Sequence, residues 1–223
     1  MQAEFWLQRW REGRTGFHRD TVMPELARHW SSLALPGQSR VFVPLAGKST
    51  DMLWLASQGH HVLAVELSPL AVEQFFDEQG VQPAIHESTA GRHFVAGSIE
   101  LICGDVFDLD AATLSGCVGI YDRAALIALP VDMRRRYAAH LADVLPAGSR
   151  MLLITLDYAL AEMDGPPFSV GAEEVAALYS DRWQISRLER RDSLADKPRF
   201  SESGVSTMHI DVWRLQQSDR FIV

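Results

Sequence analysis

The chain has 223 residues, of which 47% are hydrophobic and 22% charged, so it is long enough to bury a sizeable core as one α/β domain. A net charge of −8, a pI near 5.4 and the lack of a basic run argue against nucleic acid and anionic membranes as partners. No apolar run reaches membrane-spanning length and the N-terminus lacks the apolar core of a signal peptide, so we expect a cytosolic protein.

The N-terminal segment predicts two helices. Residues 2–10 form a short helix that carries Trp6 and Trp10, and a second helix opens at Thr21. Phe17 lies in the polar segment between them. The second helix has apolar residues at helical spacing, namely Val22, Leu26, Trp30 and Leu33. Aromatic residues so near a terminus can belong to the core or to a lid over a ligand, and the spacing alone favours the core.

Residues 40–66 predict a strand, a helix and a second strand. Arg40–Pro44 and His61–Val65 are short apolar runs typical of buried strands, and Ser49–Gln58 carries its apolar residues on one helical face. Gly59 ends the helix, where a positive φ is usually required. A strand–helix–strand unit of this length indicates a parallel sheet.

Two features of this unit lie at carboxyl ends of strands, where such folds bind ligands. One is the Leu45–Gly47 turn, which leads into the helix. The other is Glu66, directly after the second strand, where an acidic residue roughly 20 residues after the turn binds ribose hydroxyls in dinucleotide sites. One carboxylate can accept hydrogen bonds from both hydroxyls of a diol. Glu66 could equally serve only to cap the strand, and the local pattern does not decide between the two.

The glycine content of the turn limits the nucleotide. The G-x-G-x-x-G fingerprint is absent because only Gly47 is present, which argues against NAD and FAD. The string Gly47-Lys48-Ser49 imitates the end of a P-loop, but Phe42 stands where that motif needs its first glycine. A nucleoside without phosphates fits better, and S-adenosylmethionine is the leading candidate.

The rest of the chain alternates helices and strands. Ser68 and Pro69 are typical of a helix N-cap and first turn, and they open a helix that extends to Gln79. Further strands are predicted at residues 99–103, 116–121, 149–156, 183–190 and 205–215, with a short strand also compatible with 93–96, and further helices at 132–145 and 173–180. This order predicts a three-layer, doubly wound α/β fold whose mostly parallel seven-stranded sheet ends in an antiparallel C-terminal strand pair.

Three further charges are candidate site residues. Asp105 follows the third strand and could accept a hydrogen bond from an adenine amino group or cap a helix. Arg123 follows the fourth strand, where a guanidinium can bind a carboxylate bidentately or pair with Asp122 or Glu66. Arg199 lies in a charged loop, and a solvated charge is its default interpretation.

Cysteine and histidine contents predict neither a disulfide framework nor a metal site. The two cysteines, Cys103 and Cys117, lie in or beside predicted strands, and we expect buried, reduced thiols. The eight histidines show no H-E-x-x-H spacing, and C-x-x-C is absent.

Several stretches together resemble the bacterial branch of the thiopurine S-methyltransferase family. They are residues 6–10, the segment Gly13-x-Thr15-Gly16-Phe17-His18, VFVPLAGKSTDMLWLASQGHHVLAVELS, Asp105–Leu109, Tyr121–Leu126 and Gly165–Phe168. The PLxGKS and VELS pieces in combination are far more specific than one glycine motif. Ala46 departs from the family, which usually has cysteine there, and this excludes a catalytic thiol at that position.

The resemblance implies a class I methyltransferase fold with S-adenosylmethionine as methyl donor and S-adenosylhomocysteine as product. It implies a single domain over residues 1–223, in which residues 1–35 form a helical arm that covers the site and residues 36–217 form a Rossmann-like core. The implied cofactor contacts are Trp10, Leu45, Glu66, Asp105, Val106 and Arg123. The implied acceptor contacts are Phe17, Arg123 and, in a loop that aligns poorly, Arg199. Neither a catalytic base nor a metal ligand is assigned.

The implied reaction is S-methylation of thiopurines and other small aromatic or heterocyclic thiols by a monomer. The resemblance also suggests small selenium or tellurium compounds as acceptors.

Two other classes of function stay open. A nicotinamide-dependent oxidoreductase would share the sheet and the ribose acid but needs the missing glycine fingerprint. A non-catalytic binder of an adenosyl ligand would keep Glu66 and the arm but show no turnover.

Overall fold

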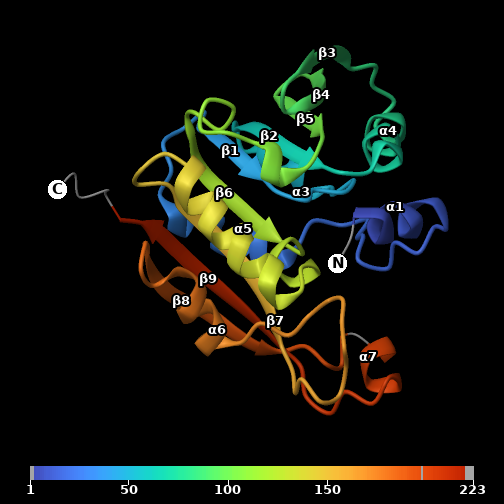
Figure 1. The fold of residues 1–223 in the computed structure, drawn as a ribbon, viewed down its shortest axis with the longest axis vertical. Helices are drawn as coiled ribbons and strands as arrows, with labels where there is room; N and C mark the ends of the chain where they lie inside the picture. Colours follow the sequence, from blue (N-terminus) through green and yellow to red (C-terminus); the bar gives the residue numbers. More distant parts are fainter. Residues whose placement is uncertain (1–2, 197, 219–223) are drawn as a thin grey trace.

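The computed structural model describes residues 3–196 and 198–218, with the side chain of Arg199 excepted, and its centre is a mixed sheet of nine strands (Figure 1). The strands are β1 (Arg40–Val43), β2 (His61–Glu66), β3 (Ala84–Ser88), β4 (Gly91–Ala96), β5 (Ile99–Cys103), β6 (Cys117–Arg123), β7 (Arg150–Asp157), β8 (Trp183–Asp192) and β9 (His209–Gln217). Their order across the sheet is β3-β4-β5-β2-β1-β6-β7-β9-β8. The five central strands, β5 to β7, are parallel, and both edges are antiparallel.

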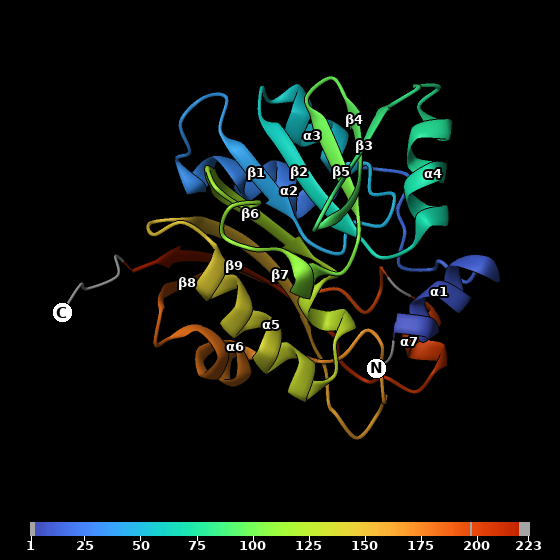
Figure 2. The ribbon, with the colours of Figure 1, turned by 45° about the horizontal axis from the view of Figure 1, so that its top comes forward.

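Helices cover both faces of the sheet. The helices of the described residues are α1 (Ala3–Arg11), α2 (Pro24–His29), α3 (Asp51–Ser57), α4 (Pro69–Glu78), α5 (Val131–Val144), α6 (Ala172–Tyr179) and α7 (Pro198–Glu202), with 3₁₀ turns η1 (Trp30–Leu33), η2 (Val106–Asp108) and η3 (Leu126–Ala128). Figure 2 shows α5 and α6 on one side of the sheet, α3 and α4 on the other, and α1 with α7 beyond one end of the strands. The expected three-layer α/β fold with a parallel centre and an antiparallel C-terminal strand pair is confirmed.

Two residues that were predicted to mark the start or end of a helix do so in the structure. The Ser68 hydroxyl accepts a hydrogen bond from the Ala71 N–H at 3.4 Å and caps α4, whose first residue is Pro69. Gly59 follows α3 with φ +85°, the left-handed conformation that glycine adopts without strain.

The sheet has two more strands than the seven that were predicted. Residues 93–96 belong to β4, and its partner β3 was missed because all five of its residues are exposed. An exposed edge strand gives no alternation of buried and solvent-facing positions for a pattern to detect. The last strand begins at His209 rather than at Val205, since Pro198 opens α7 in the predicted loop and Gly204 turns the chain with φ +93°.

The second helix begins three residues later than predicted. Met23 is extended, its N–H donates to Asp51 Oδ1 at 2.8 Å, and Pro24 takes the first helical position of α2. Asp51 also accepts from the Tyr121 hydroxyl at 2.8 Å. A buried acid on α3 thereby anchors the N-terminal segment to the sheet. Within the described residues, no helix is long and apolar enough to cross a bilayer.

Candidate active site

A cavity of about 900 Å³ opens at the carboxyl ends of the parallel strands. Its lining includes seven of the eight predicted site residues: Trp10, Phe17, Leu45, Glu66, Asp105, Val106 and Arg123. Pro198 and Phe200 also line it, but the Arg199 side chain lies outside the described part of the chain, so its role stays a prediction. The volume is at the upper end of the range for small-molecule sites.

Glu66 connects the two turns that form the floor of the cavity. Its side chain lies between the end of β2 and the turn after β1, and only 7% of the residue is exposed. Oε2 accepts a hydrogen bond from the Gly47 N–H and Oε1 from the Ser68 N–H, both at 2.8 Å. Burial raises the pKa of Glu66, and the backbone hydrogen bonds from Ser68, Gly47 and Leu67 oppose that rise. A carboxylate has about four acceptor positions, so Glu66 can still accept from the hydroxyls of a diol.

Backbone conformation is strained beside the cavity. Leu45 and Ala124 have φ of +47° and +65°, which is uncommon for residues other than glycine, and both line the cavity. Leu45 is part of the turn that the Glu66 carboxylate holds, and Ala124 directly follows Arg123. Strained residues collect at ligand sites because the surrounding structure must fix a backbone path that is not the relaxed one.

Asp105 caps a 3₁₀ turn, which is one of the two roles considered for it, and its contact with an adenine amino group stays a prediction. Its Oδ1 accepts a hydrogen bond from the Phe107 N–H at 3.0 Å and caps η2, while the residue also lines the cavity. The cap fixes the orientation of the carboxylate and leaves acceptor positions on it for a ligand.

Arg123 forms no ion pair with any described carboxylate, so the alternative of a salt bridge to Asp122 or Glu66 is wrong. Asp122 is buried and instead accepts from the Tyr137 hydroxyl at 2.7 Å. Arg123 Nη1 donates to the Phe17 carbonyl at 3.2 Å. A half-buried guanidinium at the cavity wall thus ties the N-terminal segment to β6 and retains unused N–H groups.

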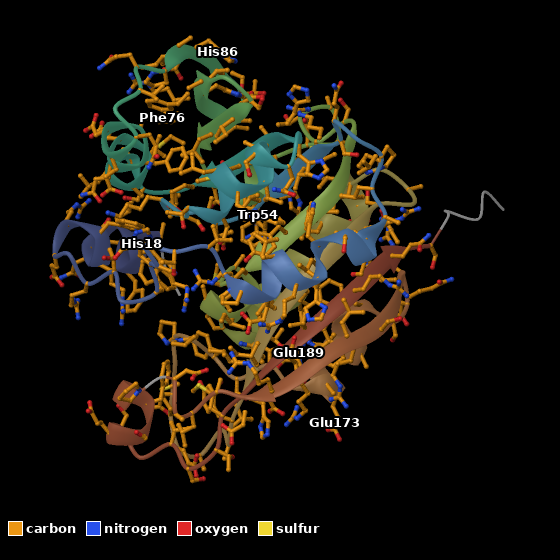
Figure 3. All side chains as sticks on the ribbon, turned by 180° about the vertical axis from the view of Figure 1, so that it is seen from behind. His18, Trp54, Phe76, His86, Glu173 and Glu189 are labelled. Carbon is orange, nitrogen blue, oxygen red and sulfur yellow. The ribbon has the colours of Figure 1, made fainter. Side chains whose placement is uncertain are left out.

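The aromatic residues of the arm lie over this floor. Phe17 makes edge contacts with Trp6 and Trp10, each with ring centroids 5.6 Å apart. Trp10 is 4% exposed, and a Cβ on Gly47 would lie 3.2 Å from its Cζ2. The same aromatic side chains therefore pack against one another and form a wall of the cavity. His18 follows Phe17 on this arm and lies beside α1 (Figure 3). It also lines the cavity.

Replacing Gly47 by alanine should destabilise the protein and weaken binding of S-adenosylhomocysteine about tenfold, because the added methyl group meets Trp10 and displaces the N–H that holds Glu66. Gly59→Ala is a matched control, since Gly59 also has positive φ but no atom lies within 4 Å of the place that a Cβ would take there. Urea unfolding should give a loss of about 1–2 kcal/mol for both variants, from the left-handed backbone. Calorimetry should detect weaker binding only for Gly47→Ala, and equal affinities in both variants would contradict the contact.

Sequence reasoning missed several cavity residues that come from distant parts of the chain. They include Met23, Lys48, Ile154, Leu156, Pro166, Pro167 and Phe200. Most are apolar, and nothing in a local pattern separates an apolar side chain at a cavity wall from one in the core.

One group of possible metal ligands lies elsewhere, on the three strands β3, β4 and β5 at one edge of the sheet. Ligand atoms of His86, His93 and Glu100 lie within 4.8 Å of one another, and Figure 3 shows His86 far from the arm that carries His18. Both ring nitrogens of His93 are already hydrogen-bonded, Nδ1 to Glu100 and Nε2 to Ser88, each at 2.7 Å. The rings of His86 and His93 are stacked, so their lone pairs do not converge on one point.

Comparison with known proteins identifies the family. Residues 1–218 match the thiopurine S-methyltransferase family profile. The protein named thiopurine S-methyltransferase of Xanthomonas campestris pv. campestris (strain 8004) is 57% identical over 217 residues, which cover 97% of this chain and 100% of the relative. The protein of that name from Bordetella parapertussis is 56% identical, with 97% and 99% covered.

Solved structures agree on the fold. The Burkholderia thailandensis 1,6-didemethyltoxoflavin-N1-methyltransferase, solved with S-adenosylhomocysteine, matches with a TM-score of 0.64 at 18% identity, covering 97% of this chain and 87% of that one. The N-methyltransferase NodS from Bradyrhizobium japonicum, also with S-adenosylhomocysteine, gives 0.64 at 14% identity, with 95% and 97% covered. The chain therefore belongs to the thiopurine S-methyltransferase family.

Proposed function

We propose that the protein transfers the methyl group of S-adenosylmethionine to the sulfur of a small aromatic or heterocyclic thiol such as a thiopurine. The observation that carries the proposal is the Glu66 carboxylate, which backbone N–H groups of Gly47 and Ser68 hold at the cavity floor and which can still accept from the hydroxyls of a diol. The family membership and the relatives named thiopurine S-methyltransferase support the same reaction.

The lining residues fit an adenosyl cofactor without phosphates. Glu66 would accept from the ribose hydroxyls, and Asp105 with Val106 would border the adenine. Leu45, Trp10 and Arg123 would border the methionine part, with Arg123 near its carboxylate or near the acceptor. When bound, the cofactor supplies an activated methyl group on a sulfonium. The aromatic arm favours that cation electrostatically and keeps water away from it.

The acceptor would occupy the apolar end of the cavity. Phe17 would stack on an aromatic acceptor, and Ile154 and Phe200 line the same cavity. A thiopurine is acidic enough to be partly thiolate near neutral pH, so the protein's task is to align the sulfur with the methyl group and to stabilise the anion. Arg123 is the residue we assign to that anion, and no general base is needed.

Selenium and tellurium anions are soft nucleophiles like a thiolate, and an apolar aromatic pocket discriminates weakly among them. We therefore include small selenium and tellurium compounds among the proposed acceptors. Residues 1–35 would act as a cover over the site formed by residues 36–217, which is supported by the bond from Arg123 to Phe17 and by the contact of Trp10 with the Gly47 turn.

The proposal is tested in two steps. Calorimetry with S-adenosylhomocysteine and NADH should give binding of the first alone, and binding of NADH alone would favour an oxidoreductase. A methyl-transfer assay with 6-mercaptopurine, a thiophenol and a benzeneselenol should then give S-methylated product from the thiols and Se-methylated product from the selenol. Binding of S-adenosylhomocysteine without turnover on any acceptor would make the protein a non-catalytic adenosyl binder.

A further inference from the structure

Helix α5 packs against the outer side of one cavity wall, the wall against which we place the adenine ring. The wall consists of Asp105, Val106 and Phe107, which line the cavity from η2 and the residue that caps it. His140 Nε2 lies 2.9 Å from the Val106 carbonyl oxygen. A carbonyl can only accept, so Nε2 carries the proton and donates, which fixes this hydrogen bond's direction.

A second group on the same face of α5 covers Phe107. The Arg136 guanidinium carbon lies 3.9 Å from the centre of the Phe107 ring, well inside the range of a cation–π contact. The His140 ring meets the same phenyl ring with centroids 5.7 Å apart. Residues four apart on a helix share one face, so Arg136 and His140 act on η2 as a pair. Arg136 forms no ion pair with any described acid, and the Phe107 ring is the contact that orients it.

We propose that His140 and Arg136 are positioning residues for the adenine ring of the cofactor. Neither lines the cavity, so they act through the backbone of Val106 and the ring of Phe107. A wall that is already ordered before binding lowers the entropy cost of fixing it when the ligand arrives. This inference rests on the proposed placement of adenine against η2.

The helix supplies a matched control. Arg135 is the neighbour of Arg136, carries the same charge and is exposed, but it pairs with Asp132 at 3.4 Å rather than with a residue of η2. Arg135→Ala therefore removes the same charge from the same helix without changing the wall.

The test is calorimetry of the full-length protein with S-adenosylhomocysteine, together with steady-state kinetics. His140→Ala should raise Kd about fivefold, by loss of one hydrogen bond. Arg136→Ala should raise it about threefold, by loss of a cation–π contact at an exposed site. Arg135→Ala should leave Kd unchanged. His140→Gln, which keeps a side-chain N–H donor, should recover most of the affinity.

The kinetic pattern separates positioning from general damage to the fold. KM for S-adenosylmethionine should rise in step with Kd, while kcat at saturating cofactor and KM for the thiol stay near the wild-type values. The affinity of adenosine, used as a competitive inhibitor, should fall by the same factor, since adenosine keeps the adenine ring that this wall contacts. Wild-type affinity in both alanine variants would overturn the inference and leave the cofactor site intact. Failure of the wild-type protein to bind S-adenosylhomocysteine would instead refute the proposed function.

Discussion

Replacing Glu66 by alanine should weaken binding of S-adenosylhomocysteine by about 100-fold or more, the largest effect we expect from any single change in the cavity. The substitution removes the acceptors for the ribose hydroxyls and leaves the Gly47 and Ser68 N–H groups without their carboxylate. A lost hydrogen bond to a charged group costs about 1.5–3 kcal/mol, and 1.4 kcal/mol is about tenfold in affinity. Calorimetry at neutral pH measures the effect directly.

Glu66→Gln tests the charge of the side chain, because glutamine has nearly the same shape as glutamate but is neutral. The amide has one acceptor oxygen, so its nitrogen must face one of the two backbone donors, and affinity should fall by about tenfold or more. Asp196→Asn is the control, because it neutralises a carboxylate that lines the same cavity without touching the Gly47 turn or a proposed cofactor contact. Affinity of Glu66→Gln within about threefold of wild type would contradict the role of the carboxylate.

Through this carboxylate, the stability of the unliganded protein and its affinity for the ligand should depend on pH in opposite directions. Burial raises the pKa of Glu66 above its usual 4.5 in the unliganded protein, so its contribution to stability is present at low pH and is lost as pH rises through the raised value. Ribose hydroxyls donate to the ionised form, so affinity should instead fall as pH decreases through that same value, already above pH 4.5. Glu66→Gln should show neither trend.

The parts of the molecule that the sequence predicted well are those that local chemistry decides. The buried strands, the Ser68 cap and the positive φ of Gly59 follow from runs of apolar residues and from single-residue conformational preferences. Glu66 could be placed because its position after a strand is itself a local feature. The strand β3 gave no such pattern, since its residues are exposed on an edge.

The contacts that could not be predicted join residues far apart in the chain. The Phe17 carbonyl and Arg123 are 106 residues apart, and the Met23 N–H and Asp51 are 28 apart. The pattern of a single sequence does not indicate which residues of two distant segments will be in contact. The same limit explains why His140 was not considered, because its partner is a backbone carbonyl 34 residues away that has no sequence signature.

Replacing Arg123 by alanine should lower kcat/KM for a thiol acceptor by about 10- to 100-fold, as expected for loss of a charged hydrogen-bond donor beside a developing or existing anion. Arg123→Lys keeps the charge but lacks the planar guanidinium, so its kcat/KM should lie between those of the wild type and of Arg123→Ala. Arg19→Ala is the control, since Arg19 is an exposed arginine at the same cavity. Measuring Kd for S-adenosylhomocysteine in parallel decides which ligand Arg123 binds: a loss confined to Kd assigns it to the cofactor carboxylate.

The ratio of wild-type to Arg123→Ala activity should depend on pH in a way that follows the acceptor. Below the pKa of the thiol, the enzyme must favour the thiolate over the neutral form, and the guanidinium supplies that preference. Above this pKa the acceptor is already ionised, so the ratio should shrink, although the anion still gains from the nearby charge. Two acceptors of different acidity should therefore give the same curve displaced along the pH axis. A ratio of one at every pH would remove Arg123 from the reaction, while a constant ratio above one would limit it to holding Phe17 and the arm.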